Sequence, residues 1–284
     1  MRKYEFKMLA IDVIDGLDNN FYVIDVNGLV GVQSILKHKD IFHTELRKFF
    51  DNNYSFECSW SSIVDIVDFD LLNEGLNLNS LVIIENNGFI HEDKLEWRKI
   101  YNFPAPAITL GKSSCLEMHD NPDYPKFLTK PNFSFGGMGI ELHNTEIEPK
   151  EKHFVEKYIP GKLIDGHCYH SRLIIITNEY ETLPILRLNK LCSKPIIRNL
   201  KQMTLSEDQS YSYISNKEDE KDPNYFNDKW EKWILNTDDR FEKFSLELVD
   251  MIKSVNNGDN PWYIEEIKEY LKQEQTLIDF LSKF

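Results

Sequence analysis

The most informative absence in this 284-residue sequence is that of a long apolar segment. No run approaches the roughly 20 apolar residues that a membrane-spanning helix needs. The amino-terminal region has no signal-peptide pattern either, because Asp12 and Asp15 interrupt its only apolar stretch. We therefore expect a protein that has no membrane partner and that works in the cytoplasm.

Cysteine is also scarce, and its four copies lack the paired spacing of a metal site: Cys58, Cys115, Cys168 and Cys192. The pattern favours free thiols in a reducing compartment. His167 and His170 lie close to Cys168, but neighbouring residues on a strand point to opposite faces. This run therefore does not favour a metal site.

Basic residues are fewer than acidic ones, 33 against 47, which gives a formal net charge of −14. Such a charge argues against non-specific nucleic-acid binding as the main role, so we expect no nucleic-acid partner. The remaining composition, 41% hydrophobic and 28% charged, is that of an ordinary globular protein. The length predicts two or three lobes, and composition gives no indication of the oligomeric state.

The segment with the most specific chemistry is 126–161, KFLTKPNFSFGGMGIELHNTEIEPKEKHFVEKYIPG. It predicts a strand ending at Lys130, a glycine-rich loop, and a second strand from His153 to Ile159. A lysine at the end of a strand supplies a fixed positive charge for phosphate oxygens. Glycines let backbone N–H groups approach a phosphate closely. The candidate phosphate-binding residues of the loop are Ser134, Gly136, Gly137 and Gly139.

The end of the second strand is the candidate adenine-binding hinge. Its backbone donors and acceptors would lie beside an adenine edge, and its residues are Glu156, Lys157, Tyr158 and Ile159. The alternative is an ordinary hairpin with a glycine-rich turn, since glycine loops alone are weak motifs.

Residues 6–28 predict a β-hairpin, because two apolar, β-branched runs flank the turn sequence DGLDNN. Asp12 lies on the first strand. Asp25 and Asn27 lie two apart on the second strand, where side chains share one face. Two carboxylates and an amide oxygen are ligands that Mg²⁺ takes alongside nucleotide phosphates. The alternative is a set of surface carboxylates beside a turn.

Together these segments resemble the ATP-grasp superfamily. A strand ending in lysine, a loop of the form S-x-G-G-x-G-I and a hinge of the form E-x-Y-I occur here in that family's order. The D…D-V-N hairpin resembles the family's metal-binding end, which normally lies near the C-terminal end of the domain. Here it precedes the lysine and the loop. The resemblance therefore implies a circularly permuted ATP-grasp fold, which domains with adjacent, exposed termini tolerate.

The implied fold class is α+β, with two α+β subdomains that clasp ATP and a small α/β lobe. The implied domains are the metal-binding hairpin at 1–33, the small lobe at 34–100, a lid subdomain at 101–161 and a C-terminal subdomain at 162–284. We expect a helix over 32–50, a strand within 78–87, a polar insertion at 204–238 and a terminal helix over 262–284.

An amphipathic helix is predicted over 239–254. In a permuted domain it would pack beside residues 6–14 without a direct covalent link. One alternative keeps the usual family order and takes WYIEEI (262–267) as the metal-binding strand. We favour permutation because that run lacks the asparagine of the N-terminal hairpin.

Further site residues come from the resemblance and from charges within apolar runs. Lys94, before a short helix, would be the family's first ATP-contacting lysine; a solvated helix lysine is the alternative. Arg172 and Arg187 lie in two long strands predicted over 161–190, where an arginine needs an anionic partner. The resemblance places Arg172 towards substrate or phosphate, and Arg198 near the metal and the γ-phosphate.

The resemblance implies an enzyme that uses ATP and Mg²⁺. The first hypothesis is a ligase that joins a carboxylate to an amine through an acylphosphate, with a small-molecule or peptide acceptor. The second is a kinase that phosphorylates a small-molecule hydroxyl, such as that of an inositol phosphate, and the Asp25-Val26-Asn27-Gly28 run favours it. The third is a protein that binds ATP without turnover.

Overall fold

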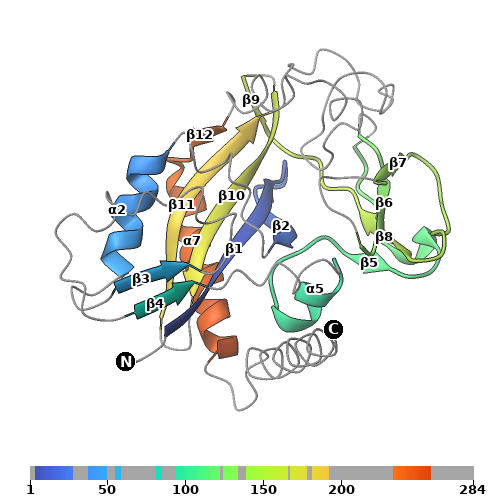
Figure 1. The fold of residues 1–284 in the computed structure, drawn as a ribbon. Helices are drawn as coiled ribbons and strands as arrows, with labels where there is room; N and C mark the ends of the chain where they lie inside the picture. The colour runs from blue at the N-terminus through green and yellow to red at the C-terminus, as the bar shows by residue number, and fades with distance from the viewer. Residues whose placement is uncertain are drawn as a thin grey trace, which may run out of the picture.

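The computed structural model describes residues 4–27, 38–49, 55–58, 81–84, 94–121, 124–133, 139–165, 167–177, 181–191 and 233–256. Over these ranges the protein is mixed α/β, with mostly antiparallel strands and few helices (Figure 1). The elements are β1 (Tyr4–Asp15), β2 (Phe21–Asn27), α2 (Lys39–Phe49), β3 (Ser55–Cys58), β4 (Leu81–Ile84), α5 (Glu96–Ile100), β5 (Ile108–Thr109), η1 (Ser113–Cys115), β6 (Phe127–Pro131), β7 (Glu141–His143), β8 (His153–Lys157), β9 (Leu163–Ile164), β10 (His167–Thr177), β11 (Thr182–Leu191), β12 (Trp233–Leu235) and α7 (Asp239–Asn256).

The larger sheet has eight strands and is built around β1. Its main path of hydrogen-bonded strands runs in the order β12-β11-β10-β1-β4-β3. β10 pairs antiparallel with one edge of β1, and the hairpin partner β2 pairs with the other edge. β4 pairs in parallel with the first residues of β1, Tyr4 to Phe6. The long antiparallel pair β10 and β11 confirms the two strands predicted over 161–190.

One face of β1 packs against α7. Alternate residues of β1 form this face, as strand geometry requires, and Leu9, Ile11 and Val13 join Phe241 and Leu248 of α7 in one buried core. The predicted helix over 239–254 is thus confirmed, and it packs beside the N-terminal strand without a direct covalent link, the arrangement expected of a permuted domain.

A β-bulge in β2 directs two consecutive side chains to the face away from α7. Asp12 is the partner of Asp25, but Val13 is the partner of Val23, so Ile24 is an extra residue. Val23 belongs to the α7-side core, whereas Ile24 packs in a second core with residues of the smaller sheet. The bulge therefore puts both Ile24 and Asp25 on the side that faces the smaller sheet.

The smaller sheet has four strands in the order β5-β8-β6-β7, all within 101–161. Leu128 and Tyr158 pack against Ile14 and Ile24 of the hairpin. Backbone hydrogen bonds add to this contact, because the turn after β1 pairs with the segment after β8. In Figure 1 β2 and α5 lie between the two sheets.

Two strands described within the predicted small lobe at 34–100, β3 and β4, pair with each other in parallel. β3 and β4 extend the larger sheet beyond β1, because parallel pairing satisfies the backbone of Tyr4 to Phe6. The helix expected over 32–50 is described from Lys39 onward, and the strand within 78–87 is confirmed as β4. Residues 204–232 and 262–284 lie outside the described ranges, as does the alternative metal-binding run WYIEEI.

The two strands predicted within 126–161 are present as β6 and β8, with one addition. A short strand, β7, pairs with β6 before the chain reaches β8. Among the described helices, none has the length and apolar character needed to cross a bilayer.

Candidate functional site

Charged side chains gather where the hairpin of the larger sheet meets the smaller sheet and α5. We call this group the inter-sheet cluster, and its members are Asp12, Asp25, Lys94, Arg98, Lys130, Glu156 and Arg172. Four of them are cations and three are carboxylates, in a chain whose formal net charge is −14. The cluster is therefore locally cationic, which favours an anionic ligand.

Lys130 is fully enclosed between the two sheets. Strand alternation places it on the same face of the smaller sheet as Leu128, whose cross-strand partner is Glu156. The Lys130 Nζ lies 2.7 Å from Glu156 Oε1 and donates to the carbonyl of Ile24 at 3.2 Å. Burial lowers the pKa of Lys130, and the Glu156 carboxylate limits the fall. Lys130 thus links the smaller sheet to the bulge of β2.

Glu156 bridges two cations in a fully buried position. Its second oxygen accepts from Arg98, whose guanidinium also donates to the carbonyl of Pro106 at 2.9 Å. A buried carboxylate needs compensation by charge and hydrogen bonds, and Arg98 and Lys130 supply both to Glu156. α5 is thereby attached to the end of β8.

Lys94 contacts Asp25 from the segment that precedes α5. Its Nζ donates to Asp25 Oδ2 at 2.8 Å, and both side chains are mostly buried. The backbone N–H of Lys94 donates to the carbonyl of Asn132, next to the end of β6. The two lysines predicted to contact ATP therefore lie on adjacent segments and face the same stretch of β2.

Asp12 forms a two-point ion pair with Arg172. Its Oδ1 and Oδ2 accept from Nε and Nη2 at 2.7 and 2.8 Å, and His170 Nε2 lies 3.5 Å from Oδ1. Burial opposes ionisation of Asp12, but the charges of Arg172, His170 and Lys190 hold its pKa at about 2. Asp12 in turn raises the pKa of Arg172 against the opposing effect of burial.

The predicted metal ligands differ in how well they suit Mg²⁺. Asp25 has one buried oxygen, Oδ1, that none of the described residues reaches with a hydrogen bond, and Asn27 follows two residues later on the same face. Asp12 fits poorly, because Arg172 occupies both of its oxygens. Among the described residues, no group of three or more His, Cys, Asp or Glu side chains is placed to hold a metal. Asp25 with Asn27 is therefore the part of the predicted set that suits the ion, since Mg²⁺ uses one or two carboxylates plus substrate phosphates.

Backbone groups of the predicted hinge form hydrogen bonds within the protein, which the sequence pattern does not indicate. The N–H of Lys157 donates to Ala107 O at 2.9 Å, and that of Tyr158 donates to Lys126 O at 3.1 Å. The side chains of Tyr158 and Ile159 are buried in the core between the sheets. In this structure these two N–H groups are bonded within the protein.

The structure does not bring Arg187 into the cluster. Arg187 is the cross-strand partner of Leu173, which belongs to the α7-side core, so it lies on the opposite face from Arg172. It reaches Glu242 of α7 at 3.0 Å, in a partly exposed ion pair. Gly139 has φ +76°, and a Cβ there would lie 2.8 Å from Pro131 Cγ, so this loop position requires glycine. Ser134, Gly136, Gly137 and Arg198 lie outside the described residues.

Two members of this region were not predicted from the sequence. Arg98 was not singled out because it is one of several charges on a short helix, and His170 because it was considered only with Cys168. The usable signal for His170 was its position two residues before Arg172 on the same strand, which puts both side chains on one face.

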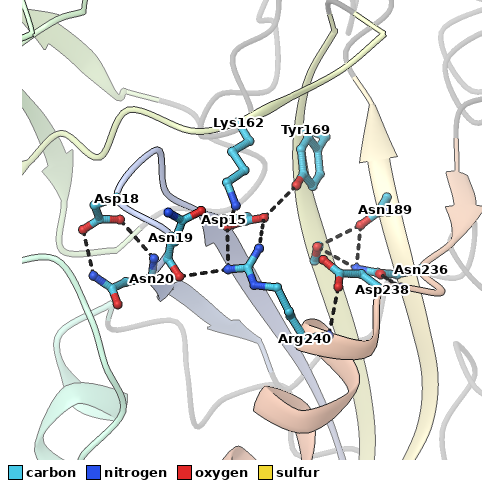
Figure 2. Close-up of polar contacts among 11 residues, drawn as sticks. Asp15, Asp18, Asn19, Asn20, Lys162, Tyr169, Asn189, Asn236, Asp238 and Arg240 are labelled. Carbon is cyan, nitrogen blue, oxygen red and sulfur yellow. Dashed lines mark hydrogen bonds and ion pairs between the residues drawn. The ribbon is translucent and has the colours of Figure 1, made fainter.

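A second polar cluster surrounds Asp15, at the end of β1 (Figure 2). This buried carboxylate lies 3.0 Å from Lys162 Nζ and accepts from Tyr169 and from both terminal nitrogens of Arg240. Arg240, in the first turn of α7, also donates to Asn19 O at 2.8 Å. Burial, with Asp15 nearby, raises the pKa of the Tyr169 hydroxyl. Through these contacts Asp15 joins the hairpin turn to β10 and α7, so we assign it a structural role.

The sequence matches no known protein-family profile and no curated protein sequence. Function is therefore inferred from the arrangement of the side chains.

Proposed function

We propose that the protein is an enzyme with a circularly permuted ATP-grasp architecture that binds ATP with Mg²⁺ at the inter-sheet cluster and joins a carboxylate to an amine through an acylphosphate. The observation that carries this proposal is the meeting of Lys94, Lys130 and Asp25. These residues come from three separate segments and were singled out on sequence grounds alone. Their side chains collect at one junction, where Lys94 bonds Asp25 directly.

The packing of α7 supports the permuted arrangement. The helix that would precede the metal-binding strand in the usual order lies beside β1, even though β1 is at the other end of the sequence. The hairpin and the helix form one core, so the order of segments along the chain does not prevent an ATP-grasp domain.

In the proposed reaction Lys94 and Lys130 hold nucleotide phosphates as point charges. Both now pair with carboxylates, so phosphate binding would exchange one anionic partner for another. Mg²⁺, held by Asp25 and Asn27, would neutralise charge on the phosphates. Arg172, oriented by Asp12, would stabilise the oxygens of the acylphosphate or its transition state.

A kinase on the same scaffold is the second candidate, and the Asp-Val-Asn-Gly run at residues 25–28 favours it. The two reactions share the nucleotide site and differ in the product. A ligase releases ADP and free phosphate only when an acid and an amine are both present, whereas a kinase yields ADP and a phosphorylated acceptor.

Direct nucleotide binding tests the proposal. We expect a fluorescent ATP analogue to bind with Mg²⁺, and we expect Lys94→Met and Lys130→Met to weaken its affinity about tenfold or more, since each removes a charge-assisted contact. Lys99→Met is the matched control, because Lys99 is exposed on α5. A folded wild-type protein that fails to bind Mg²⁺-ATP at millimolar concentration contradicts the proposal. Product analysis with panels of acids, amines and alcohols then separates ligase from kinase.

A further inference from the structure

Glu156 is shared by two cations that come from different parts of the chain. Its oxygen Oε1 lies 2.7 Å from Lys130 Nζ, and its oxygen Oε2 accepts a hydrogen bond from Arg98 of α5. Glu156 is fully buried, and a buried carboxylate is destabilising unless opposite charge compensates it. Because each cation contacts a different oxygen, one of them can leave while the contact of the other is kept.

Arg98 is held by contacts that do not involve Lys130. Its Nη1 donates to Pro106 O at 2.9 Å, and its guanidinium carbon lies 4.5 Å from the ring centroid of Trp97, which is buried. Stacking on an aromatic face and bonding through the planar fork both restrict a guanidinium. Arg98 is therefore a fixed cation, attached to α5 and directed at Glu156.

Lys130 lies near the end of β6 and faces the bulge of β2. Its Nζ donates to Ile24 O at 3.2 Å, beside Asp25 in the chain. Burial lowers the pKa of Lys130, the Glu156 carboxylate opposes the fall, and the Arg98 charge adds to it. The electrostatic field of Arg98 thus reaches Lys130 across the carboxylate that both residues contact.

We propose that Arg98 is a positioning residue that lets Lys130 move from Glu156 to a phosphate of the bound nucleotide. While Lys130 contacts the phosphate, Arg98 compensates the buried carboxylate. Without Arg98 the same movement would leave Glu156 with no cation at ion-pair distance among the described residues, so Lys130 would remain on Glu156. The positioning role rests on the proposed function, whereas the sharing of Glu156 by two cations does not.

A stability cycle tests the sharing without nucleotide. Urea denaturation compares wild type, Arg98→Met, Lys130→Met and the double variant, all in trimethylamine N-oxide, which keeps marginally stable variants folded. Each single variant leaves Glu156 with one cation, but the double variant leaves it with neither. The double variant should therefore lose more stability than the sum of the two single losses. A loss that equals the sum, or falls below it, overturns the sharing.

Nucleotide affinity tests the positioning role. Arg98→Met should weaken the binding of a fluorescent Mg²⁺-ATP analogue about tenfold when Glu156 is present. In the Glu156→Gln background the same substitution should change the affinity less than about twofold, because no carboxylate needs compensation there. A simple loss of positive field would weaken binding equally in both backgrounds. A purely structural role of Arg98 would lower stability and leave the affinity of the folded protein unchanged.

Two further variants complete the measurement. Arg98→Lys keeps the charge and should bind the analogue more tightly than Arg98→Met does, a comparison that stays decisive if Glu156→Gln fails to fold. Arg187→Met is the matched control, because its ion pair with Glu242 lies on the opposite face of the larger sheet from the inter-sheet cluster. We expect its affinity to equal that of wild type.

The outcomes separate this role from the proposed function. Wild-type affinity in Arg98→Met, equal weakening in both backgrounds, or equal affinities of Arg98→Lys and Arg98→Met overturn the positioning role, while the proposed function stands. A wild-type protein that does not bind Mg²⁺-ATP contradicts the proposed function and the positioning role together. In that case the stability cycle still decides whether the two cations share Glu156.

Discussion

Asp12 and Arg172 are cross-strand partners on β1 and β10, and their side chains form a two-point ion pair at 2.7 and 2.8 Å. The pair joins the N-terminal hairpin to a strand 160 residues later in the chain. It also assigns Asp12 a role in orienting Arg172, which differs from the metal-binding role that its position in the hairpin predicts.

Removing the charge of either Asp12 or Arg172 should destabilise the fold. We expect Asp12→Asn and Arg172→Met each to lower the free energy of unfolding by about 3–5 kcal/mol, because each leaves a buried charge without its partner. The double variant should lose less than the sum of the two. Urea denaturation provides the four free energies, and Arg187→Met, whose partner Glu242 is half-exposed, should cost less than about 1 kcal/mol. Additive losses would show that the two side chains do not interact.

The contribution of Asp12 should disappear in acid. The folded protein holds its pKa at about 2, below the usual 3.8, so the carboxylate stabilises the fold fully above pH 3.8. As the pH falls from that value through about 2, Asp12 takes up a proton and about 2 kcal/mol of this stability is lost. The free-energy difference between wild type and Asp12→Asn, measured by urea denaturation from pH 5 to pH 2, should shrink accordingly. A difference that is independent of pH would contradict the lowered pKa.

Glu156 should be required for both stability and the position of Lys130. Glu156→Gln leaves Lys130 and Arg98 buried together without the carboxylate that both contact, which should cost about 3–5 kcal/mol. Glu141→Gln is the matched control in the same sheet, because its ion pair with Lys150 is exposed and should contribute less than about 1 kcal/mol. Thermal or urea denaturation measures the loss of stability in each of the two variants. Equal effects would mean that Glu156 does not bridge the two cations.

The contact between the hairpin and α7 should behave as one cooperative core. Phe241→Ala removes a fully buried ring from this core and should cost about 3–5 kcal/mol through lost packing and a cavity. Leu246→Ala, on the exposed side of the same helix, should cost much less. Hydrogen exchange of β1 amides should accelerate in Phe241→Ala but not in Leu246→Ala. Unchanged exchange would show that α7 does not stabilise the hairpin.

Local pattern was sufficient for the elements that carry the candidate site. Period-two runs and turn residues predicted the hairpin, β10 and β11, and helical periodicity predicted α7, because these signals depend on near neighbours along the chain. The position of Lys130 at the end of a strand was also predictable. The joining of β3 and β4 to β1 was not, since strand pairing between distant segments has no local signature.

Register explains most of what the sequence did not reveal about the site. Arg172 and Arg187 look equivalent as single charges in apolar strands, yet the register of β10 against β11 puts them on opposite faces. A one-residue shift would exchange those faces. The partner of Glu156 on α5, Arg98, depends on how that helix lies against the smaller sheet, which neither segment specifies alone.

By itself the sequence determined which residue types occupy the strands around the site: an aspartate and asparagine two apart, a lysine before a proline, and arginines in apolar runs. These features can be recognised from the spacing of residues along the chain. Tertiary structure alone decided which charges meet. The β2 bulge turned Ile24 and Asp25 to the same side, and the pairing of β1 with β10 bonded Asp12 to Arg172. A buried charge must find an opposite charge in three dimensions, and the nearest one is set by packing and register, not by distance along the chain.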